Sequence, residues 1–281
     1  MNMRQAEHTD LTRHAHALAV SGYTTLRKQI DPAELEQLRK ETERALAASR
    51  VARKAGRKLA YTGSSAFYEA TRCLYCWGDA SRRLLEHESI HALAGLMMGK
   101  YLLWDLSALS ALPTPADAKA ATTGWHRDFG GPHCGSETPS YLWFFVCLDD
   151  VTPDNGATWL VPGSHRLISR FEPDAGAAWS GDSFDKYPSQ VQVCANAGDL
   201  VVLNPALLHS SGRNASSQPR RLLNLGVCHA DLDPLLDHWA IAGPAIQQQA
   251  GKRLKSFLGA DRKPQDATWT ILPDGWRTGR A

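Results

Sequence analysis

A histidine and an aspartate stand two residues apart, His126 and Asp128, in the segment TGWHRDF at 123–129. In a strand, side chains two residues apart point to the same face, so these two could reach one point while Arg127 points away. An imidazole nitrogen and a carboxylate oxygen are two of the three ligands of the 2-His-1-carboxylate triad, which holds Fe(II) and leaves three coordination positions open. The pair alone is weak evidence, because it could equally be a structural hydrogen-bonded pair.

The third ligand of such a triad has to come from a distant part of the chain. His209 is the best candidate, because it follows the apolar run DLVVLN and lies 83 residues after His126. We expect it at the end of that strand, although a histidine here could instead cap the turn formed by the following Ser-Ser-Gly. If the two strands lie side by side, His126, Asp128 and His209 can share one metal ion.

An arginine follows at a spacing that suits a co-substrate. Arg220 begins the next apolar run, 11 residues after His209, and a β-hairpin with this loop would place its guanidinium near the metal but not on it. There it could bind the far carboxylate of 2-oxoglutarate through two parallel charged hydrogen bonds, while the keto-acid end binds iron and one position remains for O2. Arg221 is the alternative, since adjacent strand residues face opposite sides, but the spacing favours Arg220.

Short apolar runs with turn residues between them indicate a β-rich core from about 101 to 230. The runs are YLLWDLSAL, TGWHRDF, SYLWFFVCLDDV, ATWLVP, SQVQVCA, DLVVLN and RRLLNLGVCHA. Many short strands at this spacing are typical of a sandwich or double-sheet barrel, not of alternating strands and helices. Asn155-Gly156 lies between two of these runs and predicts a hairpin, because both residue types tolerate positive φ.

Helical patterns flank this core on both sides. The part at about 1–100 favours helices, one starting at the Asp31-Pro32 cap and another at about 81–98, with the short strand YTTLRKQI ahead of them. The part at about 231–281 is helical again. No repeat or linker divides the chain, so we expect a single domain over 1–281 that is mainly β, with helices around a central jelly roll.

Composition excludes several classes of protein. Hydrophobic residues make up 43% and charged residues 21%, with a net charge of +2. The small charge argues against a nucleic-acid partner, and no apolar run approaches the roughly 20 residues of a membrane span. The first 20 residues lack the apolar centre of a signal peptide, so we expect a cytoplasmic protein, as a monomer or a homodimer. Cys73 and Cys76 form a C-x-x-C pair without other ligands at zinc spacing, which favours reduced thiols.

Three segments together resemble the phytanoyl-CoA dioxygenase-like (PhyH) branch of the 2-oxoglutarate oxygenases. They are GWHRD, LDDVTPDNGATWLVPGSHR and GDLVVLNPALLHSSGRNASSQPRR, in the family's order and spacing, and SGYTTLRKQIDPAELEQLRKE resembles its opening strand and helix. The resemblance covers most of residues 18–230. It implies a double-stranded β-helix (jelly-roll, cupin-like) core with Fe(II) on His126, Asp128 and His209.

The same resemblance implies a co-substrate site and a reaction. Arg220 would bind the C5 carboxylate of 2-oxoglutarate, Ser211 would support that carboxylate, and Phe145 would lie beside the co-substrate. The implied reaction uses O2 to hydroxylate an unactivated C–H bond of a small-molecule metabolite or natural-product intermediate, and releases succinate and CO2. Desaturation, epoxidation and ring rearrangement share the oxidant. Halogenation is disfavoured, because related halogenases have a small residue at the position of Asp128.

Residues outside these motifs are the candidates for substrate contacts. The aromatic ones, each of which could also be plain core, are Tyr61, Phe67, Tyr75, Trp77, Trp104, Phe129, Trp143 and Trp159. Arg127 and the basic stretch at 50–58 favour an anionic small molecule, the stretch being either a solvated loop or a lid over the site. His133 lies in a Gly/Pro-rich loop and could face the substrate, whereas His165 is expected to be structural.

Two other kinds of protein remain as alternatives. A non-catalytic jelly-roll module could bind a small molecule on the same scaffold, although it would have no reason to keep both a metal triad and a spaced arginine. A cupin-type metalloenzyme that does not use 2-oxoglutarate would usually carry a more histidine-rich metal set. The co-substrate arginine therefore distinguishes the oxygenase from both.

Overall fold

The computed structural model describes residues 3–57, 65, 67–118, 122–129, 138–167, 187, 189–263 and 272–279, with only the backbone of 3–9. The helices are α1 (Met3–Ser21), α2 (Pro32–Lys54), α3 (Asp79–Leu84), α4 (Glu88–Met98), α5 (His238–Gln247) and α6 (Lys252–Phe257). The strands are β1 (Tyr23–Leu26), β2 (Tyr68–Thr71), β3 (Tyr101–Ala111), β4 (Tyr141–Cys147), β5 (Thr158–Leu160), β6 (Val191–Val193), β7 (Leu200–Leu203), β8 (His209–Ser210) and β9 (Arg220–His229). Tyr61, His133 and Lys58 lie outside the described residues.

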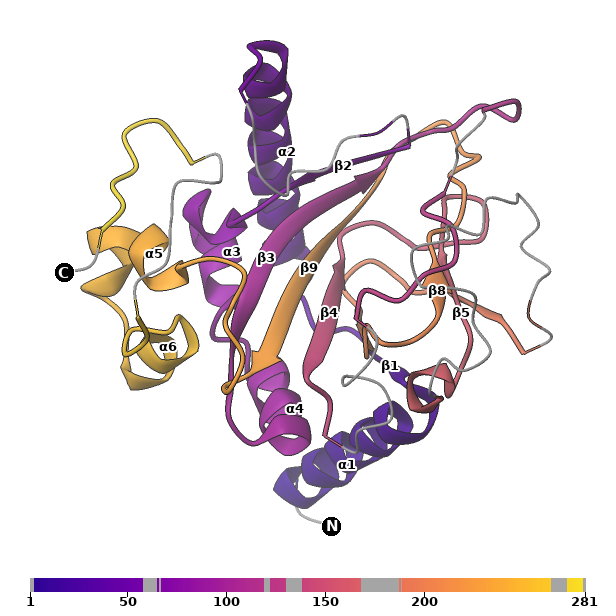
Figure 1. Ribbon diagram of the computed structural model, residues 1–281, viewed down its shortest axis with the longest axis horizontal. Coiled ribbons are helices and arrows are strands. Elements are labelled where there is room, and N and C mark those ends of the chain that lie inside the picture. Colours follow the sequence, from indigo (N-terminus) through magenta and orange to yellow (C-terminus); the bar gives the residue numbers. More distant parts are fainter. Residues whose placement is uncertain are drawn as a thin grey trace.

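The described strands form two antiparallel sheets. The large sheet has the order β1-β7-β4-β9-β3-β2, and the small sheet has the order β6-β5-β8. Figure 1 shows the long strands β3, β9 and β4 side by side, with β5 and β8 on one side of the molecule and α5 and α6 on the other. The predicted fold class, mainly β with flanking helices, is confirmed.

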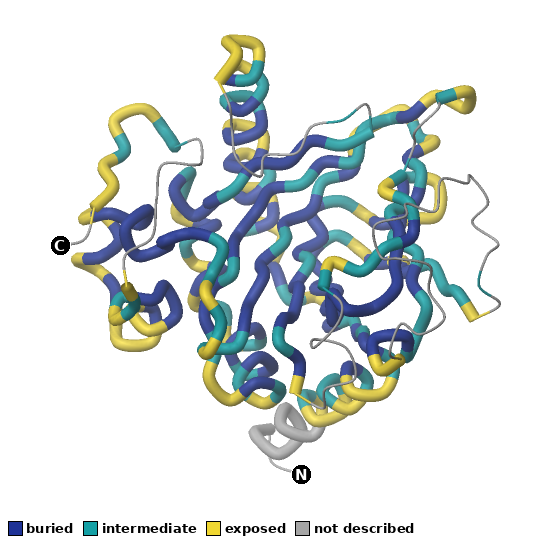
Figure 2. Tube along the Cα trace, in the orientation of Figure 1, coloured by how far each residue is buried: buried dark blue, intermediate teal, exposed yellow. Residues whose placement is uncertain are grey.

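Alternate side chains of the central strands pack into two different apolar cores. On β4, Leu142, Phe144 and Val146 pack in the core that the large sheet shares with the helices. Tyr141 and Trp143 of the same strand belong to the second core, between the two sheets. Figure 2 shows the strands β3, β9 and β4 largely buried, whereas the far end of α2 is exposed. A large sheet covered on both faces therefore forms a rigid wall for the space between the sheets.

The N-terminal helices agree with the sequence in one case and not in another. Asp31 caps α2 as predicted, and its Oδ1 accepts hydrogen bonds from the backbone N–H groups of Ala33 at 2.9 Å and Glu34 at 3.0 Å. The single helix predicted at 81–98 is wrong, because it is two helices, α3 and α4. The apolar spacing slips between Leu85 and Ile90, so one straight helix could not bury both on the same side.

Two predicted hairpins and the predicted strand position of His209 are wrong, because the chain passes between the sheets at these points. Asn155-Gly156 lies on the connection from β4 in the large sheet to β5 in the small one. The apolar run before His209 ends as β7 at Leu203, and His209 begins the separate strand β8 of the small sheet. β8 does not pair with β9, so Arg220 reaches the site from the opposite sheet.

Within the part of the chain that the structure describes, no helix combines the length and the apolar character needed to cross a bilayer. The start of the basic stretch is helical, since Arg50 and Arg53 lie in the last turns of α2. Arg50 forms ion pairs with Glu69, at 2.8 Å, and with Glu43, and Arg53 approaches Glu69 at 3.5 Å. These two arginines bind α2 to β2, which favours the structural interpretation of this part of the stretch over a lid.

Candidate active site

The first and third candidate ligands lie directly opposite each other in the backbone. His126 and His209 form an isolated antiparallel bridge, with backbone N–H···O distances of 2.9 Å in both directions. The segment around His126 is not the predicted strand, because the bridge is its single paired residue. Their ring centroids lie 4.4 Å apart. Two segments 83 residues apart are thus held in register by the same two residues that present the imidazoles.

The side chains of His126, Asp128 and His209 converge on one point. Each offers one ligand atom, and these three atoms all lie within 4.8 Å of one another. The Asp128 carboxylate oxygens lie 3.4 Å from Nε2 of His126 and 3.8 Å from Nε2 of His209. Two nitrogens and one oxygen on one side of a point match the donor set of the Fe(II) facial triad, so the residues present fit this metal.

Hydrogen bonds to the backbone set the tautomers of both histidines. Nδ1 of His126 donates to the carbonyl oxygen of Gly124 at 2.9 Å, and Nδ1 of His209 donates to that of Leu207 at 2.8 Å. A carbonyl oxygen can only accept, so each Nδ1 carries a proton. In the neutral ring the lone pair is then on Nε2, the nitrogen that faces Asp128. Both rings are held in the form that binds a metal.

Burial and nearby positive charge shift the pKa of Asp128 in opposite directions. Burial by itself raises the pKa of its carboxyl group, but the hydrogen bond with His126 and the positive charge that His209 and His126 carry when protonated outweigh it and lower the pKa to about 2. Burial lowers the pKa of His209, which favours its neutral form. The site therefore presents one anionic oxygen to a cation.

Trp143 holds the second oxygen of the carboxylate. Its indole Nε1–H donates to Oδ2 of Asp128 at 2.7 Å. The ring packs in an aromatic cluster with Trp104, Phe129 and Tyr141, in which Phe129 and Tyr141 stack at 3.8 Å. The sequence suggested Trp143 as a pocket residue but not this hydrogen bond, which depends on the placement of Asp128 opposite β4.

A cavity of about 310 Å³ opens between the two sheets at the triad. Its walls come from β2, β3, β4, β5, β8 and β9 and the loops beside them, and its lining comprises Phe67, Tyr68, Leu109, Ser110, Ala111, Thr123, His126, Asp128, Trp143, Phe145, Thr158, His209, Ser211, Gly212, Arg220, Leu222 and Asn224. All six site residues named from the sequence are in this set. Tyr68, Thr158, Leu222 and Asn224 were missed, although Leu222 and Asn224 follow from Arg220 by strand alternation.

Arg220 is buried in this cavity without an ion-pair partner among the described residues. It is 6% exposed, and its guanidinium donates to the backbone carbonyls of Gly156 at 2.7 Å and Asn155 at 3.4 Å. Among the described residues, no carboxylate lies within ion-pair distance of it. Burial lowers its pKa, as expected for a cation taken out of water. An unpaired buried guanidinium is unfavourable, so the site calls for an anionic ligand.

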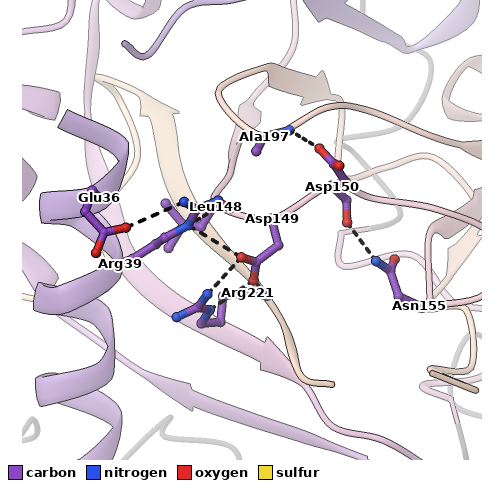
Figure 3. A network of polar contacts seen from close by, with 8 residues as sticks. All are labelled: Glu36, Arg39, Leu148, Asp149, Asp150, Asn155, Ala197 and Arg221. Carbon is purple, nitrogen blue, oxygen red and sulfur yellow. Dashed lines mark hydrogen bonds and ion pairs between the residues drawn. The ribbon is translucent and has the colours of Figure 1, made fainter. Parts of the chain in front are cut away.

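Arg221, the alternative from the sequence, points to the opposite side and is fully engaged there. Its guanidinium binds both carboxylate oxygens of Asp149, at 2.8 and 2.9 Å, and its backbone N–H donates to the same group at 2.8 Å. Figure 3 shows Arg39 beside Arg221, also directed at Asp149, with its Nε 3.5 Å from the carboxylate. Of these two adjacent residues, Arg220 therefore lines the cavity and Arg221 forms a structural ion pair.

Ser211 and Phe145 both line the cavity, as the resemblance implied. The Oγ of Ser211 accepts a hydrogen bond from the backbone N–H of Thr123 at 2.8 Å, and its own N–H donates to Oγ1 of Thr123 at 3.0 Å. This pair joins the His126 segment to the end of β8. In this pair the Ser211 hydroxyl oxygen accepts a hydrogen bond. Its hydroxyl proton can therefore be donated to a nearby acceptor.

Other candidates lie away from the cavity. Arg127 points away from the triad and donates to the carbonyls of Ser164, at 2.9 Å, and Ala206. His165 is buried, and its Nε2 donates to Ala19 at 3.3 Å, as expected for a structural residue. The remaining aromatic candidates in the described chain also lie outside the lining. Tyr75, Trp77, Trp104 and Phe129 pack in or against the apolar cores, and Trp159 is half-buried on β5.

A second group with metal-ligand side chains is a closed polar network. Cys73, Asp105 and His238 are buried with their ligand atoms within 4.8 Å of one another. Asp105 is already paired with Arg72 at 2.7 Å. His238 donates from Nε2 to the carbonyl of Trp104 at 2.7 Å and accepts from Tyr75 at Nδ1. The aspartate is neutralised and both ring nitrogens are used, so this group does not fit a cation.

Comparison with known proteins identifies the family. The family described as phytanoyl-CoA dioxygenase (PhyH) matches residues 19–222. The chain is 25% identical over 252 residues to dioxygenase sphC of Aspergillus fumigatus, covering 85% of this chain and 64% of that protein. It is 29% identical over 164 residues to dioxygenase olcK of Penicillium canescens, covering 55% and 49%. The chain thus spans about half to two thirds of the length of these relatives.

Solved structures share the fold. The epimerase SnoN from nogalamycin biosynthesis, in complex with Fe3+, alpha ketoglutarate and nogalamycin RO, has a TM-score of 0.61 at 24% identity, covering 95% of this chain and 97% of that one. HygX from Streptomyces hygroscopicus, with nickel, 2-oxoglutarate and hygromycin B bound, has a TM-score of 0.58 at 19% identity, covering 78% and 87%. The predicted cupin-like fold and family are confirmed: this chain belongs to the phytanoyl-CoA dioxygenase (PhyH) family, whose members use Fe(II), 2-oxoglutarate and O2.

Proposed function

We propose that this protein is an Fe(II)- and 2-oxoglutarate-dependent oxygenase that hydroxylates an unactivated C–H bond of a small molecule. One observation carries the proposal: a triad of two imidazoles and a carboxylate opens into the same cavity as a buried guanidinium that forms no ion pair with a described carboxylate. A metal site alone would not require the arginine. An anion site alone would not require three converging ligands with both histidine tautomers set for metal binding.

The cavity residues would bind the metal and the co-substrate separately. His126, Asp128 and His209 would hold the iron, and Arg220 would bind the C5 carboxylate of 2-oxoglutarate, with Ser211 and Phe145 beside it. When bound, iron and 2-oxoglutarate supply the oxidation of a C–H bond by O2 with release of succinate and CO2. The apolar cavity walls exclude water from the reacting atoms, and the rigid sheet behind them fixes the position of the target carbon.

The lining indicates what kind of substrate fits. Along β2 and β3, beside Arg220 and Leu222, the walls also offer Phe67, Tyr68, Leu109 and Ala111, which suit an apolar ring or chain. Arg220 is the one cation in the described lining, and the co-substrate uses it, so this lining favours a largely uncharged substrate over the anionic one expected from the sequence. The dioxygenase relatives and the natural-product enzymes of the same fold support a natural-product intermediate.

Hydroxylation is the reaction we propose first, and the same site suits other outcomes. The structures of similar fold include an epimerase and a carbocyclase from one biosynthetic route, so desaturation, epoxidation and ring rearrangement are tested alongside it. Product analysis by mass spectrometry distinguishes them, because hydroxylation adds one oxygen from O2 and desaturation removes two hydrogens. A cytoplasmic location and a monomeric or dimeric state remain predictions from the sequence.

The test of the proposal starts without a substrate. Purified protein is mixed with Fe(II) under nitrogen and titrated with 2-oxoglutarate, and we expect a weak visible absorption band from the chelate. Metal binding with no band on adding 2-oxoglutarate would identify a metalloenzyme of the cupin type, and no metal binding would identify a non-catalytic module. Incubation with O2 and a metabolite extract, followed by succinate measurement, then identifies the substrate.

A further inference from the structure

One side-chain polar atom of the described cavity wall is buried without a hydrogen-bond partner. Asn224 lies on β9 and lines the cavity, and its Oδ1 is buried without accepting any hydrogen bond. Neither atom of its carboxamide bonds to another described residue. Of the buried side-chain polar atoms without a partner in the described chain, this is the one that belongs to the cavity lining. Leaving such a group unpaired is unfavourable, so its retention points to a ligand.

The strand pairing places Asn224 between the guanidinium and the triad. Along the cavity face of β9, alternate residues are Arg220, Leu222, Asn224 and Gly226. Asn224 pairs with Phe145 on β4, and the next pair towards the triad is Gly226 with Trp143, whose indole binds Asp128. Going along the strand, the wall therefore presents a cation, an apolar side chain and a carboxamide, and then reaches the triad.

This order matches the order of groups in 2-oxoglutarate. The co-substrate has a carboxylate at C5, two methylene groups, and a keto-acid end that lies at the metal. With Arg220 at C5, the methylene groups would face Leu222 and the keto-acid end would face Asn224. Strand residues rise about 3.3 Å each, so the backbones of Arg220 and Asn224 are about 13 Å apart, a span that the two side chains and the ligand would fill together.

We propose that Asn224 binds the C1 carboxylate of 2-oxoglutarate, with its amide Nδ2–H as the donor. The inference rests on the proposed function, since it needs the co-substrate in this cavity. At neutral pH 2-oxoglutarate has acceptors and no donors, so the amide nitrogen is the atom that can bind it. The unpartnered buried atom is Oδ1, but a half-turn about the last side-chain bond exchanges oxygen and nitrogen at little cost. Nδ2 can therefore take that position and donate to the ligand. The protein binds this end of the co-substrate in addition to the metal.

A structural asparagine in the same chain shows the contrast. Asn214 donates from Nδ2 to the carbonyls of Ala111 at 2.9 Å and Gln218 at 2.8 Å, and its Oδ1 accepts from Ser216 at 3.0 Å. Removing that carboxamide breaks bonds in the ligand-free protein, whereas removing the Asn224 carboxamide breaks none. The two asparagines therefore predict opposite effects on stability, which makes Asn214 the matched control.

The experiment compares Asn224→Leu, Asn224→Asp and Asn214→Leu with the unmodified protein. Thermal unfolding without metal or co-substrate should show Asn224→Leu as stable as the unmodified protein or more so, and Asn214→Leu less stable. Anaerobic titration of the Fe(II) protein with 2-oxoglutarate, followed through the visible band, should show a dissociation constant raised at least tenfold in Asn224→Leu. Asn224→Asp should weaken binding further, because it sets a carboxylate against a carboxylate.

The outcomes separate this inference from the proposed function. If the unmodified protein gives no band, the proposed function fails and the inference fails with it. If the unmodified protein gives the band and Asn224→Leu binds 2-oxoglutarate equally well, the inference is overturned and the function stands, with Asn224 then free to serve the substrate. Should Asn224→Leu not fold, Asn224→Asp decides, since unweakened binding by that variant also overturns the inference.

Discussion

Arg220 and Arg221 show how one step along a strand separates two roles. Both begin β9, and their side chains point to opposite faces of the sheet. On the outer face Arg221 meets Asp149, and on the inner face Arg220 meets only backbone carbonyls. Both side chains carry the same charge, but only Arg221 forms an ion pair with a described acid, so the guanidinium of Arg220 can bind an anionic ligand.

The two arginines therefore give a matched pair of variants. Arg220→Gln should raise the dissociation constant of 2-oxoglutarate by about 10- to 100-fold, because two charged hydrogen bonds are lost. Arg221→Gln should leave that constant unchanged within about twofold and instead lower the stability of the protein. Anaerobic titration of the Fe(II) protein with 2-oxoglutarate measures the dissociation constant in both variants. Equal losses of affinity in the two variants would contradict the assignment of the carboxylate site to Arg220.

Trp143 is the residue that we expect to position the metal ligand. Trp143→Phe keeps an aromatic ring in the cluster but loses the hydrogen bond to Asp128. Partners of this kind typically change metal affinity by about 10- to 100-fold, so Fe(II) should bind more weakly by that factor while the fold persists. Isothermal titration with Fe(II) under nitrogen checks the affinity, and circular dichroism checks the fold. Unchanged affinity would show that the indole only packs.

At the scale of elements, the connections between the two sheets build the site. The connection from β4 to β5 supplies the carbonyl of Gly156 to Arg220, and the turn from β7 to β8 brings His209 opposite His126. Gly156 has φ +89°, and a Cβ there would lie 2.9 Å from the backbone oxygen of Gly212. The crossing is thus closely packed against the loop that follows β8.

Gly156→Ala tests this arrangement. The substitution is both strained in φ and too close to Gly212, so we expect a loss of about 1–3 kcal/mol in the free energy of unfolding. Because the displaced carbonyl supports Arg220, the affinity for 2-oxoglutarate should fall as well. Gly56→Ala is the control, since Gly56 has a similar φ of +73° but open space around it. If both variants bind 2-oxoglutarate equally, the crossing does not position the arginine.

The ion pair between Asp149 and Arg221 links β9 to the segment after β4 and depends on pH. Burial by itself raises the pKa of Asp149, but the hydrogen bonds from Arg221 and the charges of Arg221 and Arg39 outweigh it and lower the pKa. A carboxyl group with a lowered pKa stabilises the fold above its unfolded pKa, about 3.9, and loses that contribution as the pH falls through its folded value.

Asp149→Asn should therefore be less stable than the unmodified protein at pH 7, by about 1–2 kcal/mol for this partly buried pair. The difference should narrow steadily as the pH falls below about 4, because the unmodified carboxylate then becomes protonated as well. Urea unfolding at pH 7, 5 and 3.5 measures it. A difference that stayed constant with pH would mean that the loss comes from packing and not from the charge.

For the whole molecule, the candidate site joins the two sheets. Asp128 hydrogen-bonds to β4 of the large sheet, His209 belongs to the small sheet, and Arg220 comes from β9. Metal and co-substrate bound at these residues would connect both sheets to each other. Ligands that bind only the folded state raise its stability in proportion to the logarithm of their concentration over the dissociation constant.

Fe(II) with 2-oxoglutarate at about 100 times its dissociation constant should add about 2.7 kcal/mol to the stability. For a chain of this size the melting temperature should rise by roughly 5–10 °C, and a chelator should reverse the rise. Differential scanning fluorimetry under nitrogen measures both changes. In Arg220→Gln the metal-dependent part of the rise should remain while the 2-oxoglutarate part is lost.

The sequence by itself predicted which residue types the candidate site contains and determined which face of the central strands is apolar. The candidate ligands His126, Asp128 and His209 and the preference for Arg220 come from residue type and spacing, and the alternation of the central strands comes from a period of two. These are local properties, because side-chain direction in a strand depends only on the chain itself. The order and spacing of the family motifs indicated that these residues belong to one site.

Only the tertiary structure decided which sheet each segment joins. The hairpins predicted at Asn155-Gly156 and between His209 and Arg220 are crossings between sheets, and the segment around His126 is a single bridge to His209. Strand pairing is a long-range choice made by burial and backbone hydrogen bonds over the whole chain, which no local pattern contains. The hydrogen bond from Trp143 to Asp128 and the unpaired carboxamide of Asn224 are results of that choice.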